Sequence, residues 1–404
     1  DVAGGDLASG RSDLLVVDAQ TGINPSALLR PTILNGEAMD RGTQYRFKII
    51  GDDTFADDSL FSLQNRLGWS FSQSLEADGL YLVLLRNGGA GGGVSVWVCS
   101  VGTPNACRTA EAYDRMVSSG QAGQLGFLGQ VLDDLSLADP TYVAESFLKL
   151  SGEFHPSLSG AIQEHDQDFV RQLRGQIAPP QGGWPLWLTV SGLENRGQAS
   201  SHFAKGKLRG AEAVLGTSKQ LPSDWILGGA LRFGSYDYDY RLDSADVNGF
   251  TGALFAEKSF QTGADSLFKL YLGASYGRHE VDAKRRVNIV GETMGFHSSP
   301  KSDYTISNFQ VFTEAAYLMP LTTCLDIEPY LGLGWSNLQR EGLTEKHGQE
   351  ANLKAKGLKE DRFASELGFR LHNDFQSGLN LSGNLGWRHR YGHPNHRDEF
   401  SFAA

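Results

Sequence analysis

From Trp184 onward the sequence alternates apolar with polar or small residues over several runs, and this pattern constrains the fold more than any other feature. In the first run, every second residue from Trp184 to Val190 is apolar. Because successive side chains of a strand point to opposite faces, such a run predicts a β-strand with one apolar face. The same alternation occurs at 268–277, 325–336 and 379–388, and it fits further strands near 225–234, 308–317 and 363–371.

The polar face of these strands is rich in glycine and carries isolated charges, which favours a membrane β-barrel over a soluble β-sandwich. A narrow lumen that holds another element needs small residues for clearance and a few charges for pairing, whereas a sandwich would expose a heavily charged face. Aromatic residues near the strand ends suit the girdles of a membrane barrel; they are Trp184, Trp225, Trp335 and Trp387. The polar residues that we expect in the lumen are Arg232, Lys269, Gln310, Glu314, Glu328, Glu366, Arg370 and Arg388.

The connections between these strands fall into two classes. Segments 236–243, 285–303 and 340–359 are long and charged, and segments 261–264, 320–323 and 376–378 are short. One rim with long loops and another with short turns is the asymmetry of outer-membrane barrels.

Helical periodicity replaces the strand pattern between residues 109 and 175, and its last part is unusually polar. A helix that is polar nearly all round is either solvated or unstable alone. Inside a polar lumen it would be shielded and hydrogen-bonded, so we expect residues 157–174 to thread the barrel. Its candidate pore-facing residues are Glu164, Asp166, Asp168, Arg171 and Arg174.

The first 95 residues show short β-rich segments separated by Gly, Asn and Asp clusters, as turns demand. They are 13–18, 45–50, 60–64, 68–74 and 79–85, and a small free-standing β-sandwich is an alternative interpretation of them.

The run 88–93 (GGAGGG) lacks the Lys-Ser/Thr of a phosphate-binding loop and predicts a flexible linker. Cys99 and Cys107 follow it as a disulfide candidate, whose compact loop would contribute roughly 2.5–3 kcal/mol. Two lone cysteines are a poor metal site, since structural sites need four ligands.

Composition excludes several function classes. Lys and Arg number 36 against 47 Asp and Glu, for a net charge of −11, which argues against nucleic acid as the main partner. No apolar run reaches the ~18–20 residues of a membrane helix, and no signal peptide is visible.

His393 and His396 have metal-ligand spacing but lack a third ligand, so a polar loop is the simpler interpretation. No nucleophile motif or triad is present, and we predict no catalytic, cofactor or metal site.

Several segments, taken in order, resemble a known family. KLSGEFHPSLSGAIQEHDQDFVRQLRG, PLWLTVSG, FKLYLGASYGRHEVDAKRRVNI, FQVFTEAAYLMPL, IEPYLGLGWSNL and FASELGFRL are similar to the autotransporter barrel domain, over about residues 150–404. GRSDLLVVDAQTG and LFSLQNRLGWSFSQSLEADGLYLVLLRN resemble the end of a pertactin-type passenger β-helix.

The resemblance implies a mainly β chain in three parts: the end of a passenger β-helix (1–95), a Gly/Cys linker with a pore-threading helix (96–183), and an antiparallel transmembrane β-barrel (184–404). The family barrel has twelve strands pierced by an α-helix, whereas we count about nine here. We therefore expect the chain to be a piece of a longer one, truncated at both ends. We see no match to the helix motif at which some autotransporters cut themselves.

The function implied is type V secretion: an outer-membrane translocator that exports and anchors its own passenger, with residues 1–95 at the bacterial cell surface. Outer-membrane lipid, the barrel-assembly machinery and periplasmic chaperones would be its partners. The alternatives are a barrel that itself acts as a porin or an enzyme. The sequence does not choose among an adhesin, protease or esterase as passenger.

Overall fold

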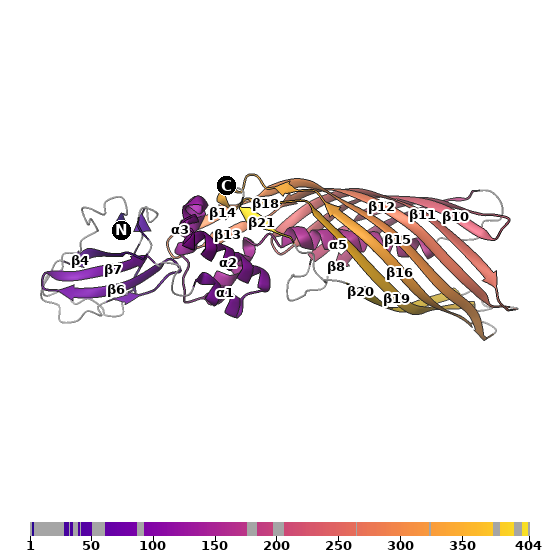
Figure 1. Cartoon of the computed structure of the whole chain (residues 1–404), viewed down its shortest axis with the longest axis horizontal. Helices are drawn as coiled ribbons and strands as arrows, with labels where there is room; N and C mark the ends of the chain where they lie inside the picture. Colours follow the sequence, from indigo (N-terminus) through magenta and orange to yellow (C-terminus); the bar gives the residue numbers. More distant parts are fainter. Residues whose placement is uncertain are drawn as a thin grey trace.

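The computed structural model describes residues 2–3, 28–31, 33–34, 39–40, 42–50, 61–86, 93–175, 184–196, 206–263, 265–322, 325–374, 380–391 and 398–402. The molecule is elongated, with a small β-module at one end, a group of helices in the middle and a curved sheet at the other end (Figure 1). The expected strand at 13–18 and the His393–His396 loop lie outside the described residues.

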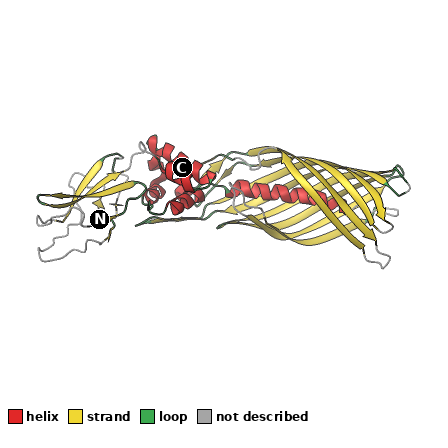
Figure 2. Cartoon of the chain, turned by 90° about the horizontal axis from the view of Figure 1, so that it is seen from below, coloured by secondary structure: helices red, strands yellow, loops and turns green. Residues whose placement is uncertain are grey.

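A nine-stranded antiparallel sheet forms the largest part, and each strand pairs with its neighbour along the sheet in the order β20-β19-β16-β15-β12-β11-β10-β9-β8. The strands are β8 (Leu186–Arg196), β9 (Gly206–Gln220), β10 (Trp225–Tyr240), β11 (Asp243–Gln261), β12 (Leu267–Lys284), β15 (Lys301–Thr322), β16 (Leu325–Arg340), β19 (Leu358–Asp374) and β20 (Asn380–Tyr391). The sheet curves around one long helix, α5 (Phe154–Gly175) (Figure 2). Within the described residues, β8 and β20 are its two edges. The predicted strand count and the helix-filled barrel wall are confirmed.

The alternation in the sequence explains which face of the sheet is which. Leu186, Leu188 and Val190 point outward and are 75, 66 and 72% exposed, as expected of a surface that faces lipid. Inward positions need small residues in places: a Cβ added to Gly216 would lie 2.1 Å from the Trp187 ring. The absence of a side chain at Gly216 therefore leaves room for the inward-pointing ring of Trp187.

Three of the expected long loops are shorter or more ordered than predicted. Segment 236–243 is mostly strand, because β10 continues to Tyr240 and β11 begins at Asp243. Its alternating tyrosines are buried against α5 while Asp237 and Asp239 face outward, so charges that suggested a loop belong to a strand. The other two loops contain the hairpin β13 (Val287–Val290) and β14 (Gly295–Ser298), and the elements β17 (Leu343–Thr344), η4 (Gln349–Ala351) and β18 (Leu353–Ala355), which pairs with β21 (Phe400–Phe402).

The segment before α5 is a group of helices that we call the cap. The sequence predicts helices from residue 109, but residues 96–108, expected as part of a Gly/Cys linker, are also largely helical. The cap comprises α1 (Val94–Val101), α2 (Pro104–Ser118), η3 (Ala122–Leu125), α3 (Gly126–Asp133) and α4 (Pro140–Lys149). Thr103 caps α2 by accepting a hydrogen bond from the Ala106 N–H, with Pro104 at the first turn. Apolar residues of these helices share one core with the hairpin residues Val287, Ile289 and Phe296. Among the helices that the structure describes, α5 alone enters the curved sheet (Figure 2).

The N-terminal β-module is a three-stranded antiparallel sheet in the order β4-β7-β6, from β4 (Gln44–Ile50), β6 (Trp69–Glu76) and β7 (Gly79–Arg86). Two-residue parallel pairs join β1 (Val2–Ala3) to β3 (Ile33–Leu34), and β2 (Leu28–Leu29) to β5 (Ser62–Leu63). The passenger β-helix therefore stays a prediction. In the part of the chain that the structure describes, no helix has the length and apolar character to cross a membrane.

Candidate functional site

Helix α5 is the centre of the candidate site because it fills the space enclosed by the sheet. At 22 residues it is about 33 Å long. It is less polar than the sequence suggested: Phe154, Leu158 and Ile162 pack on a cluster of inward tyrosines, and Phe169 and Leu173 pack on a second cluster further along. Between these two apolar contacts lies a polar turn that we call the collar, Gln163–Gln167.

Asp166 is the most heavily bonded residue of the collar. Its carboxylate forms an ion pair with Arg232, lies 3.1 Å from His279 Nε2, and accepts hydrogen bonds of 3.2 Å from Thr251 and Asn308. These four partners come from β10, β11, β12 and β15, and Asp166 is fully buried. A buried carboxylate is stable only when such partners replace water. The structure thus brings together Asp166 and Arg232, both expected from the sequence.

The other collar residues contact the remaining parts of the wall. Their contacts are Gln163 Nε2 to Ser336 Oγ at 3.0 Å, Glu164 to Arg390 at 2.6 Å, His165 Nε2 to Glu212 at 3.1 Å, and Gln167 to Arg388 at 3.5 Å. The partners lie on β16, β20 and β9. Because these contacts are directional and lie on all sides of one helical turn, they fix both the depth and the rotation of α5.

A second set of charges lies near the end of α5. Arg174 pairs with Glu314 and stands over the Tyr271 ring, 5.2 Å from its centroid. Along the wall, Arg370 bonds Glu314 at 2.9 Å and also pairs with Glu328, which Lys269 reaches at 2.8 Å. The remaining predicted residues pair elsewhere: Arg388 with Glu366 across β19 and β20 at 2.8 Å, and Asp168 with Arg171 within the helix.

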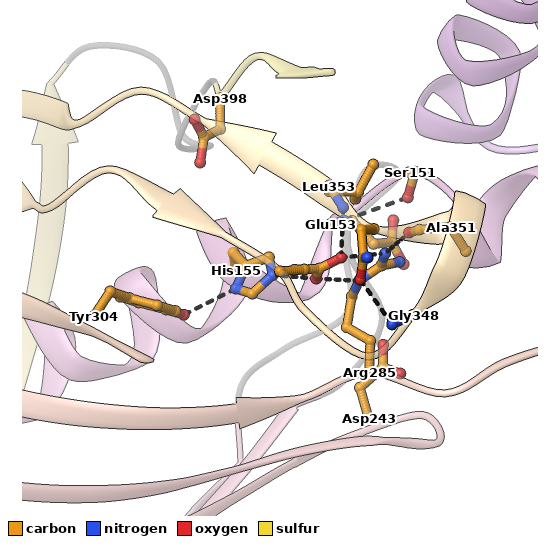
Figure 3. Close-up of polar contacts among 12 residues, drawn as sticks. Ser151, Glu153, His155, Asp243, Arg285, Tyr304, Gly348, Ala351, Leu353 and Asp398 are labelled. Atoms are coloured by element: carbon orange, nitrogen blue, oxygen red, sulfur yellow. Dashed lines mark hydrogen bonds and ion pairs between the residues drawn. The ribbon is translucent and has the colours of Figure 1, made fainter. Parts of the chain in front are cut away.

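The mouth of the lumen at the start of α5 holds a third polar cluster, which lies outside the candidate residues expected from the sequence (Figure 3). His155, at the start of α5, lies 2.9 Å from Tyr304 Oη through Nδ1 and 3.0 Å from Glu345 through Nε2. Arg285 donates to both oxygens of Glu345, at 2.6 and 2.8 Å. Glu345 lies outside the membrane-spanning strands; burial alone would raise its pKa, but the charge and hydrogen bonds of Arg285 outweigh burial and lower this pKa to about 2. No sequence pattern marks these residues, since Arg285 and Glu345 are 60 positions apart in different loops.

The mouth also joins the cap to the sheet. Glu153 accepts hydrogen bonds from Tyr240 at 2.8 Å, from Arg241 at 3.1 Å and from Asn105 of α2 at 2.8 Å. Further out, a disulfide links Cys99 of α1 to Cys107 of α2. Because both sulfurs are in this bond, neither is available as a thiolate ligand, although Glu111 lies beside them.

Comparison with known proteins assigns the family. Residues 186–404 match the family described as "Autotransporter beta-domain". Two proteins of Serratia marcescens, both named "Extracellular serine protease", are 26% and 25% identical over 278 and 276 residues; each comparison covers 63% of this chain and 25% of the relative. The chain thus spans about a quarter of the length of these relatives.

Solved structures similar to this chain include the translocator domain of the autotransporter NalP from Neisseria meningitidis, at 13% identity and a TM-score of 0.47, covering 60% of this chain and 79% of that one. The beta domain of the Bordetella autotransporter BrkA gives 16% identity and a TM-score of 0.32, covering 55% and 97%. The family match extends over more than half of the chain, so the chain belongs to the autotransporter beta-domain family and is an outer-membrane translocator.

Proposed function

We propose that this translocator exports the N-terminal part of its own chain through the barrel and then keeps it at the cell surface, with α5 left in the lumen as plug and anchor. The collar carries the proposal. Its five consecutive residues contact seven of the nine strands, through partners that suit one position of the helix only. A porin would need an open lumen, and here α5 occupies it.

The direction of export follows from the two rims. The cap and the β-module lie beyond the rim that carries the β13–β14 hairpin and the β17–β18 segment, while short turns such as 221–224 join strands at the other rim (Figure 1). Long loops face outward in outer-membrane barrels. We accordingly assign residues 1–95 to the surface-exposed end of the passenger, 96–183 to the cap and pore helix, and 184–404 to the barrel.

The partners follow from the same assignment. The outward leucines of the sheet would contact outer-membrane lipid, and assembly would use the barrel-assembly machinery and periplasmic chaperones. Translocator domains of this family are not themselves catalytic. Because two relatives are named extracellular serine proteases, we propose that any catalytic activity belongs to the passenger and that a hydrolase is one candidate.

Protease shaving of intact cells that express the complete natural gene tests the proposal. The probe is an antibody against residues 61–86, which the structure describes as part of the β-module. Loss of this epitope while a barrel fragment survives is the expected result, because the module should lie outside while the strands are protected in the membrane. Protection of the epitope until the outer membrane is breached would place the module in the periplasm and contradict the proposed direction of export.

A further inference from the structure

The β-module and the cap are joined by a backbone contact that bypasses the covalent connection between them. Leu67 N–H donates to the Leu135 carbonyl and Gly68 N–H to the Asp133 carbonyl, both at 2.8 Å, and Arg66 forms an antiparallel bridge with Ser136. We call residues 64–69 and 133–137 the clasp. Such strand-like pairing between two segments resembles the addition of a strand to a sheet edge, in which main-chain hydrogen bonds provide affinity.

The side chains of the clasp show that the two surfaces are closely fitted. A Cβ added to Gly68 would lie 2.3 Å from the Asp133 Cβ, so only glycine allows this approach. Leu67 beside it is buried in the apolar core of the cap. The module therefore inserts a side chain into the core of the cap as well as pairing with its backbone.

Asp134 extends this contact from the cap to the barrel. Its carboxylate accepts a 2.5 Å hydrogen bond from Arg66 of the module, and hydrogen bonds from the N–H groups of Thr293 and Met294, at 2.6 and 3.1 Å, in the turn of the β13–β14 hairpin. Its carbonyl accepts from the Glu292 N–H at 3.0 Å. One residue thus connects the module, the cap and the barrel, and both Arg66 and Asp134 are buried.

We propose that the clasp holds the β-module on the barrel without a covalent link, so that a passenger cut from its anchor within residues 87–92 remains on the cell surface. The partner of the clasp surface on the cap is the module itself, presented as an extended segment with Gly68 at the closest approach. This inference depends on the proposed function only for the cellular side on which the module lies. Once the connection is cut, the passenger would be held on the barrel by non-covalent contacts alone.

The test uses the complete natural protein on intact cells, with a site for a specific protease inserted within residues 87–92. After cutting and washing, an antibody against residues 61–86 measures how much of the module stays with the cells and how much is in the supernatant. For the parent protein, we expect most of the module to stay with the cells. Gly68→Ala should release most of it, because the added methyl group forces the two segments apart.

Gly123→Ala is the matched control, since a Cβ at this cap glycine would meet no atom within 4 Å. It should retain the module like the parent. Folding of each variant is checked before cutting by resistance of the module to a broad-specificity protease. If Gly68→Ala fails this check, Arg66→Met replaces it, because it removes the bond to Asp134 while keeping the glycine approach, and it should also release the module.

The outcomes separate the clasp from the proposed function. Release of the module from the parent protein on cutting would overturn the clasp, and so would equal retention in the parent and in the folded clasp variant. Absence of the module from the surface before cutting would instead overturn the proposed function. Cutting and washing permeabilised cells would then still decide whether the clasp holds.

Discussion

Two neighbouring helical regions of this chain are held in opposite ways. In the lumen, the middle of α5 is held by charge and hydrogen bonding, with Asp166 bonded to residues of four strands. Outside the lumen, α1–α4 are held by an apolar core in which Leu132, Phe147 and Ile289 are fully buried. A few residues of sequence separate the last helix of the cap from the start of α5.

The two kinds of contact specify structure to different degrees. Apolar burial has no preferred direction, so it can drive a cap to fold from an extended chain but accepts many arrangements. Hydrogen bonds to buried charges require particular partners at particular distances, so the collar fits at one depth.

Asp166→Asn should have the largest effect. The variant keeps the size of the side chain but removes the charge that pairs with Arg232, whose other carboxylate, Glu212, is 4.0 Å away. Removing one partner of a buried ion pair costs about 3–5 kcal/mol. That loss would shift the docking of α5 by about 10²–10³-fold or more, since each 1.4 kcal/mol is tenfold. We expect the complete natural protein in planar bilayers to show frequent large-conductance openings that the parent lacks.

Surface resistance of the cap to protease provides the control for this variant, because the cap has its own core. Conductance equal to that of the parent would show that the collar does not hold the helix.

Reversing the charge of Arg174 should open the channel more than reversing the charge of Arg171. Arg174 pairs with Glu314 on the wall, whereas Arg171 pairs with Asp168 on the same helix.

The next-largest effect should come from acidification, which should weaken the polar cluster at the mouth of the lumen. This mouth cluster consists of His155, Arg285, Tyr304 and Glu345. The pKa of Glu345 is lowered to about 2 in the folded protein, against an ordinary value of 4.5. Because the folded pKa is the lower one, its contribution to stability, about 3 kcal/mol, is present above pH 4.5 and is lost as the pH falls toward 2. Limited proteolysis of the loop around Glu345 should therefore accelerate between pH 4.5 and 3.

Glu345→Gln should remove this pH dependence and make the loop sensitive at pH 7, because Arg285 and His155 then lose their carboxylate. A loop that is equally resistant at pH 3 and pH 7 in the parent protein would contradict the role given to the pair.

Reduction of the disulfide should act on the cap alone. The bond between Cys99 and Cys107 closes a short loop, and the chain-entropy model gives it about 2.5 kcal/mol. We expect reduction to lower the denaturant concentration at which the cap becomes protease-sensitive and to leave the channel closed, because the collar does not depend on α1. Channel opening on reduction would show that the cap and the collar are coupled.

The barrel could be predicted because its pattern is local. Alternation along single strands identified seven of the strands and placed Arg232, Glu314 and Glu328 on the lumen side, where the structure has them. β9 and β11 were missed. Several of their outward positions hold small residues, Ala211 and Ala213 in β9 and Gly252 and Ala256 in β11, so the apolar half of the alternation is weak.

The cap and the mouth cluster could not be predicted, because both depend on contacts distant in sequence. Most of the cap lies within the region that the sequence predicts to be helical from residue 109, although α1 precedes it. The packing of the cap on Val287 and Phe296 joins segments about 150 residues apart. Likewise, His155 finds Glu345 only after the sheet has brought two loops together. Periodicity predicts the face on which a polar residue lies but not the residue with which it pairs. The sequence therefore places Asp166 and Arg232 in the lumen without predicting that they form an ion pair.

Leu132→Met should have the smallest effect and completes the comparison. Leu132 is fully buried in the cap core, and methionine has nearly the same volume with a flexible side chain. Volume-conserving apolar exchanges usually cost less than about 1.5 kcal/mol. The cap of this variant should therefore stay folded in a protease-resistance titration with denaturant, with a midpoint close to that of the parent. Asp166→Asn is the same kind of change, because it too conserves volume, yet it should open the channel. If both substitutions were tolerated equally well, the contrast between directional contacts in the lumen and non-directional contacts in the cap would be wrong. The collar would then be one more packed surface, with charges that solvent satisfies.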